Sequence, residues 1–129
     1  MPRSYVRGTW QQNRAFSPAV ITTGGRTIWV AGHTGQADDA GKSLAGDFEA
    51  QARQCFRNIE KTLAECGAKL SDLVTMTVFI SDPRHGDRFT EIRREIFGKD
   101  FPASALITVV GFADPRILIE IQSVAVVEG

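Results

Sequence analysis

The sequence has no long apolar run and no excess of charge of either sign. Its longest apolar stretches, such as residues 124–127, are far shorter than the roughly 20 residues that a membrane-spanning helix needs. Residues 1–5 lead into no apolar segment of a secretory signal, so we expect a cytoplasmic protein without a membrane partner. The 15 basic residues are balanced by 15 acidic ones. Because nucleic-acid binding usually needs a basic excess that neutralises phosphates, no nucleic-acid partner is expected.

Cysteine and histidine are scarce, with two of each. Cys55 and Cys66 are 11 positions apart in a stretch with helical periodicity, which separates them by about 16 Å. A disulfide requires Cα atoms within about 7 Å, so both cysteines are interpreted as small buried hydrophobic residues. His33 and His85 have no cysteine or second histidine at metal-binding spacing, and no metal site is expected. The chain also lacks a serine-hydrolase elbow, a Walker loop and a Rossmann glycine fingerprint.

Hydrophobic periodicity defines two kinds of segment in the first half of the chain. Residues 17–22 and 27–31 are β-prone, and the Gly-Gly pair at 24–25 is typical of a tight turn, so this region predicts a β-hairpin. After it, apolar residues recur at helical spacing. Asp47 suits an N-cap and Gly67 a helix stop, which together predict a helix of about five turns.

The second half of the chain again contains both β-prone and helical segments. Residues 74–80 are apolar or β-branched on both faces and predict a central strand that is covered on both sides. The Asp-Pro pair at 82–83 is typical of a helix start, and Gly98 marks the end of that second helix. Strands are predicted at 103–110 and 116–127, joined by turn-forming residues as a hairpin.

The expected fold is α+β, in the order β-β-α-β-α-β-β, with a mixed sheet and both helices on one face. At 129 residues the chain suits one hydrophobic core, so one domain over residues 1–129 is expected. Nothing remains to cover the other face of the sheet, although the last strand carries large aliphatic residues on both sides. We therefore expect the protein to associate with copies of itself. The aliphatic residues are Ile117, Ile119 and Ile121 on one side and Leu118, Val124 and Val126 on the other.

Glu120 is the most informative single residue, because it interrupts an aliphatic strand segment, residues 117–121. Glutamate is a poor strand former, and burying its carboxylate is costly unless it is paired. A buried carboxylate suits general acid–base chemistry, because burial raises its pKa. The alternative is a glutamate on a solvent-exposed strand face.

Ser104 and Gln122 are predicted to share a face with Glu120. A hairpin centred near Ala113 pairs Leu106 with Glu120 and Ser104 with Gln122, which would make a polar cluster on an apolar wall. Such a cluster is the usual composition of a ligand pocket. The alternative for Ser104 is a place at the edge of a strand.

His33 follows a strand and is a further pocket candidate. The alternative is a surface loop residue.

Several segments over nearly the whole chain occur together in the register of one known family. They are residues 15–20, 29–35, 51–54 with 58–59, 73–80, 101–103, and 119–121 with 124–126. In these segments the chain resembles the RidA (YjgF) family. The resemblance implies a chorismate-mutase-like subunit in a homotrimer, with three pockets between subunits. It also implies cofactor-independent hydrolysis of reactive enamines and imines, such as 2-aminoacrylate, to keto acids and ammonia.

The resemblance also assigns roles to particular residues. Glu120 matches a family glutamate that positions or activates water. Ala31 and Gly32 keep the small-residue backbone that approaches the ligand. Phe16 stands where many members have tyrosine, and Leu106 stands where cysteine is frequent.

The main departure from the family lies at Ser104, where members carry an arginine that holds the substrate carboxylate. Serine cannot make that bidentate, charged contact. A loss of up to about a hundredfold in binding is the expected consequence. Arg93, one turn after Phe89, lies where the family often has asparagine near the pocket, and it can bind an anion from another side. The alternative is a solvated arginine beside Arg94.

Three functions are compatible with these observations. The first is a RidA-like hydrolase or deaminase that acts on a small enamine, imine or related C–N compound, with Glu120 positioning or activating water. The second is a non-catalytic trimer that binds a small uncharged metabolite, and it is motivated by Ser104. The third is an endoribonuclease or translation inhibitor, as some family members have been labelled, which zero net charge disfavours.

Overall fold

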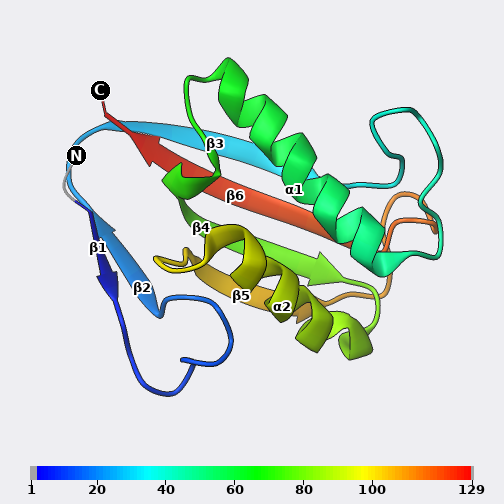
Figure 1. Cartoon of the computed structure of the whole chain (residues 1–129), viewed down its shortest axis with the longest axis horizontal. Helices are drawn as coiled ribbons and strands as arrows, with labels where there is room; N and C mark the ends of the chain where they lie inside the picture. Colours follow the sequence, from blue (N-terminus) through cyan, green and yellow to red (C-terminus); the bar gives the residue numbers. More distant parts are fainter. Residues whose placement is uncertain (1–2, 129) are drawn as a thin grey trace.

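The computed structural model describes residues 3–128 and has the α+β class that the sequence predicts. Both helices lie on the same face of the main sheet, with α1 over β3 and β6 and α2 over β4 and β5 (Figure 1). Apart from β1, which no pattern predicted, helices and strands follow the expected order. In chain order they are β1 (Arg3–Val6), β2 (Ala19–Thr22), β3 (Arg26–His33), α1 (Phe48–Glu65), β4 (Leu73–Ile80), α2 (Gly86–Phe97), β5 (Ala103–Thr108) and β6 (Ile119–Val127).

Strand pairing differs from the expectation at the first predicted hairpin. The main sheet has the order β3-β6-β4-β5, and β1 and β2 form a separate antiparallel pair. Gly24 and Gly25 do turn the chain, with φ of +71° and +82°. Beyond them, however, β3 pairs with the nine-residue β6, whereas the four-residue β2 pairs with β1. The predicted hairpin is therefore wrong, because the longer partner offers more cross-strand contacts than the neighbour along the chain.

The second predicted hairpin is also wrong, because β4 lies between β5 and β6. The crossover through α2 places β5 parallel to β4, and β6 pairs antiparallel with the other edge of β4. Glu120 is therefore opposite Phe79, and Leu106 is opposite Val78. The predicted pairs of Leu106 with Glu120 and of Ser104 with Gln122 do not exist.

The first helix begins and ends where the sequence predicts, and the second ends at Gly98 as predicted but begins at Gly86, three residues after the predicted start at Pro83. The Asp47 side chain accepts a hydrogen bond from the backbone N–H of Ala50 at 3.0 Å and caps α1. Asp82 caps a short 3₁₀ turn, Pro83–His85, that leads directly into α2, and Gly98 ends α2 with φ of +70°. The buried residues of α1 and α2 include Ala52, Cys55, Phe56, Ile59, Leu63, Phe89 and Ile92, and they pack on the sheet. None of the helices within residues 3–128 is both long and apolar enough to cross a membrane.

The two faces of the sheet differ sharply in burial. On β6, Ile119 and Ile121 are fully buried under the helices, whereas Glu120 is half-buried and Gln122 is exposed on the opposite face. Trp29 on β3 is 80% exposed. Among the described residues, no helix covers this second face, which we call the open face. The central strand β4 is therefore covered on one side within a single chain.

Gln51 is a fully buried polar residue that ties two loops to α1. Its amide nitrogen donates hydrogen bonds to the carbonyl oxygens of Leu44 at 3.0 Å and Arg116 at 2.9 Å. Its amide oxygen accepts one from the N–H of Leu118 at 2.9 Å. One side chain thus satisfies three backbone groups that helices and strands leave unpaired, including those just before β6.

Replacing Gln51 with leucine should lower the free energy of unfolding by about 2–4 kcal/mol, because three backbone groups would lose their partners while they stay shielded from water. Urea denaturation followed by circular dichroism measures this change. Gln12→Leu is the matched control, since the Gln12 side chain makes one exposed hydrogen bond, to the Gly8 carbonyl. Equal stability of the two variants would contradict this role of Gln51.

Candidate functional site

The Glu120 carboxylate lies directly over Gly32 on the open face. A Cβ atom at Gly32 would come within 2.2 Å of Glu120 Oε2. The register of β3 against β6 slips at Ala31 and Gly32, which is a β-bulge that brings the glycine backbone under the carboxylate. Within residues 3–128 no hydrogen bond or ion pair reaches this carboxylate. A carboxylate that is half-buried and unpaired in this way is available to a ligand or to a second chain.

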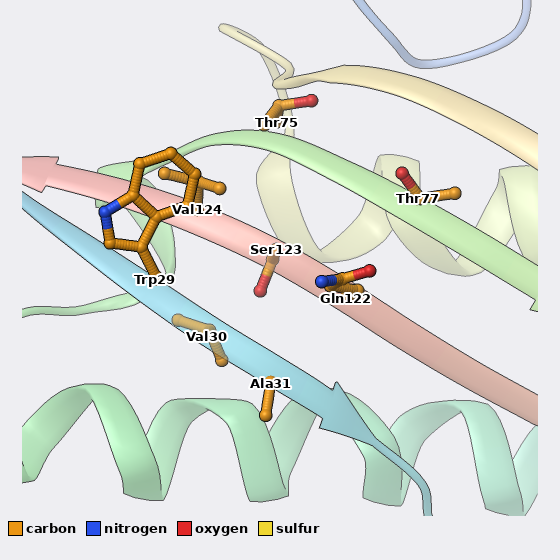
Figure 2. A pocket seen from close by; sticks show the side chains of 8 residues that line it. All are labelled: Trp29, Val30, Ala31, Thr75, Thr77, Gln122, Ser123 and Val124. Carbon is orange, nitrogen blue, oxygen red and sulfur yellow. The ribbon is translucent and has the colours of Figure 1, made fainter.

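A hollow of about 280 Å³ lies on the same open face, and neither Glu120 nor Gly32 is among the residues that line it. It contains two of the predicted site residues, Ala31 and Gln122. Figure 2 shows Trp29 beside Val124 at one end of the hollow and Gln122 near Thr77 towards the other. The residues that line it are Trp29, Val30, Ala31, Thr75, Thr77, Gln122, Ser123 and Val124.

A second cavity, of about 270 Å³, opens on the other side of the sheet, between β5, α2 and the loop before β2. It brings together four predicted site residues, which are Phe16, Arg93, Ser104 and Leu106. Arg14, Thr90 and Ala105 complete its lining. We call it the Arg93 cavity. Sequence reasoning missed Arg14 and Thr90, whose only signal was nearness along the chain to Phe16 and Arg93.

Ser104 and Glu120 lie on opposite faces of the sheet. Ser104 pairs with Met76, which is buried under the helices, and the Ser104 hydroxyl accepts a hydrogen bond from α2. Glu120 pairs with Phe79, and its side chain lies on the opposite, open face of the sheet. The predicted polar cluster is therefore wrong for Ser104, because β4 separates β5 from β6. Glu120 and Gln122 do share a face.

Arg93 points into the cavity and is only 2% exposed. It donates hydrogen bonds to Ser104 Oγ at 2.7 Å and to the Arg14 carbonyl at 3.3 Å. Its guanidinium carbon lies 5.9 Å from the centroid of the Phe16 ring and 4.9 Å from that of Phe89. Burial, together with the nearby Arg14 cation, lowers the pKa of Arg93 to about 10. The interpretation of Arg93 as a solvated residue is wrong.

His33 lines neither of these cavities. Its Nδ1 lies 2.8 Å from the Ala31 carbonyl oxygen, and its Nε2 lies 2.8 Å from Thr62 Oγ1 on α1. The ring therefore joins the end of β3 to α1. This arrangement corresponds to neither of the two roles considered for His33 from the sequence.

Cys55, on α1, lies against the end of β3 at His33 but is unsuited to nucleophilic chemistry. The thiol is fully buried and donates a hydrogen bond to the His33 carbonyl at 3.1 Å. Burial raises the pKa of Cys55 to about 12. Among the residues that the structure describes, there is also no group of three or more His, Cys, Asp or Glu side chains placed to hold a metal ion.

The "Endoribonuclease L-PSP" family model matches residues 10–127. A RutC family protein of Pyrococcus abyssi is 32% identical over 101 residues, which cover 78% of this chain and 79% of that protein. The chain belongs to the RidA/YjgF family. A human family member named 2-iminobutanoate/2-iminopropanoate deaminase is 29% identical over 111 residues, which cover 86% of this chain and 79% of the human protein.

Solved structures of RidA/YjgF family members have the same fold. The crystal structure of the Rid family protein YyfB from Yersinia pestis, a protein of unknown function, superposes with a TM-score of 0.87. It is 26% identical and covers 98% of this chain and 100% of its own. A member of the YjgF/YER057c/UK114 family from Mycobacterium tuberculosis is 30% identical, with a TM-score of 0.70 and a coverage of 98% of this chain and 100% of its own.

The Cys55 thiol should resist labelling in the folded protein, because it is both inaccessible and almost wholly protonated at pH 8. In the Cys66→Ser variant, Cys55 is the only thiol left. Its reaction with a disulfide reagent at pH 8 should be at least about a hundredfold slower in buffer than in denaturant. Absorbance of the released thiolate measures both rates. Similar rates in the two conditions would show that Cys55 is accessible and reactive.

Proposed function

We propose that this protein is a cofactor-independent C–N hydrolase of the deaminase type, acting on a small enamine or imine. The observation that carries the proposal is the Glu120 carboxylate, which has no partner among the described residues and lies against the Gly32 backbone within the aliphatic segment 117–121. The naming of relatives as 2-iminobutanoate/2-iminopropanoate deaminases supports the same reaction class.

The proposed chemistry needs one residue that moves protons. Water adds to the carbon of the C=N bond while the Glu120 carboxylate accepts one water proton and passes it to the nitrogen. The carbinolamine then expels ammonia as its hydroxyl proton moves to the nitrogen, which leaves a carbonyl product. Because the imine carbon is already electrophilic, the reaction requires no redox group.

We further propose that the active unit is a homotrimer with its pockets between subunits. Glu120 and the Arg93 cavity lie on opposite faces of one sheet, so a single chain cannot bring them to one ligand. A second copy that covers the open face can present its Glu120 to the cavity of its neighbour. The exposed Trp29 side chain on the open face supports an association of this kind.

A non-catalytic binding protein is the second candidate, and Ser104 in place of the family arginine favours it. The two candidates differ in the fate of the ligand. A binding protein would retain an imine analogue unchanged, whereas a deaminase would release ammonia from a reactive imine. The chain has no net positive charge that would attract RNA, which disfavours an endoribonuclease activity despite the name of the matching family.

Glu120→Gln should lower kcat by roughly a hundredfold to ten-thousandfold, because glutamine cannot accept and return a proton. The measurement is the rate of ammonia release from 2-iminobutanoate generated in the assay, after subtraction of spontaneous hydrolysis. Glu60→Gln, on the exposed side of α1, is the matched control and should retain the wild-type rate. Equal rates for wild type and Glu120→Gln would remove Glu120 from the mechanism.

Trp29→Asp should convert the trimer into monomers, because it places a charge on an apolar face that a neighbouring copy would bury. Sedimentation velocity measures the change in mass, and the ammonia-release assay should show a parallel loss of activity. Ile21→Asp introduces the same charge at an exposed residue of the separate β1–β2 pair and should leave the mass unchanged. A wild-type protein that sediments as a monomer would contradict the inter-subunit site.

A further inference from the structure

Among the residues that the structure describes, Arg93 is a buried cation without an anionic partner. Within residues 3–128 no carboxylate forms an ion pair with it, and the acceptors of its two hydrogen bonds, Ser104 Oγ and the Arg14 carbonyl, are neutral. Its Nε atom is buried and has no hydrogen-bond partner. Burying a charge in this way is costly unless an opposite charge compensates it. The chain therefore leaves a specific deficit in this cavity, which is one negative group at the guanidinium.

The charges around the cavity do not correct this deficit. The Arg14 side chain, at the cavity mouth, is directed to Asp87 on the outside, with Arg14 Nη1 2.9 Å from Asp87 Oδ1. Arg14 thus adds a second positive group rather than a counterion. Although the pKa of Arg93 is lowered to about 10 by burial and by Arg14, the guanidinium stays charged at neutral pH.

Contacts within the chain hold the walls of the cavity in place. Ala15 is buried with a left-handed backbone, φ +61°, which is unusual for a residue other than glycine. The conformation turns the Arg14 carbonyl and the Phe16 ring onto Arg93. Ser17 fixes the end of this loop, because its hydroxyl donates to the Phe101 carbonyl at 2.6 Å.

We propose that the Arg93 cavity binds the carboxylate of a small planar acid, with Arg93 as the anion-binding residue and Ser104 as the residue that positions it. The Phe16 and Phe89 rings lie against the guanidinium, Phe16 and Arg93 both line the cavity, and the volume of the cavity equals that of about nine water molecules. This inference rests on the proposed function for the identity of the acid, a 2-imino acid and its keto-acid product. The family resemblance implies an arginine on β5, at position 104, for this contact. In this chain the positive charge is supplied by Arg93 on α2.

The test compares binding of 2-oxobutanoate, the product of 2-iminobutanoate hydrolysis, with binding of its neutral amide, by isothermal titration to the full-length protein. Wild type should bind the acid at least about tenfold more tightly than the amide. Arg93→Met should weaken binding of the acid by roughly tenfold to a hundredfold and abolish the preference for it. Arg93→Gln, which keeps a polar contact to Ser104, serves the same purpose if the methionine variant does not fold.

Two controls separate this inference from the others. Arg94→Met, which removes the exposed neighbour that bonds the Asn13 carbonyl, should bind the acid like wild type. Glu120→Gln should lose turnover but retain the preference for the acid, so the anion site and the deaminase proposal fail independently.

The anion site would be overturned by the lack of a preference for the acid in wild type, or by a preference that persists in folded Arg93 variants. A preference that appears only in Glu120→Gln would also overturn it, because the counterion of Arg93 would then be Glu120 of a second copy.

Discussion

Successive side chains of a strand point to opposite faces of its sheet, and both helices of this protein cover the same face. Because Ile119 and Ile121 enter the core, Glu120 between them must stand on the open face. Arg93 is carried by α2, so its cavity forms on the helix side. Each of these two groups lacks an opposite charge among the described residues. No change of side-chain rotamer within one chain can bring Glu120 and Arg93 together. The need for a second copy therefore follows from the alternation of side chains between the two faces of a strand.

Local signals in the sequence were sufficient for the helices and for all strands except β1. Asp47 and Gly98 mark helix ends by chemistry that acts within a few residues, so these boundaries were predictable. Strand pairing was not predictable in the same way. Both predicted hairpins assumed that neighbours along the chain pair in space, whereas β6 inserts between β3 and β4. That choice depends on the length and burial of the distant partner, which no local pattern records.

The residues of the candidate site also differ in whether a local sequence pattern could identify them. Glu120 was identifiable because an acid among aliphatic residues is costly and thus informative. The burial of Arg93 was not, because the adjacent Arg94 gives the segment the composition of a solvated helix face. Only the helix phase, which buries Arg93 with Phe89 and exposes Arg94, distinguishes the two arginines. Ser104 was identified as a pocket residue, but its face depended on the pairing of β5, and that was predicted incorrectly.

The serine at position 104 and the arginine at position 93 are best understood as one coupled arrangement. Their side chains touch, with Arg93 Nη1 2.7 Å from Ser104 Oγ. An arginine at position 104 would bring a second guanidinium against a buried one, and like charges repel strongly where water is excluded. Serine instead supplies a small acceptor that orients the guanidinium from α2. Ser104 removes an anion-binding charge from β5 and at the same time allows α2 to provide one. The Phe16 and Phe89 rings that lie against Arg93 keep that charge desolvated and strong.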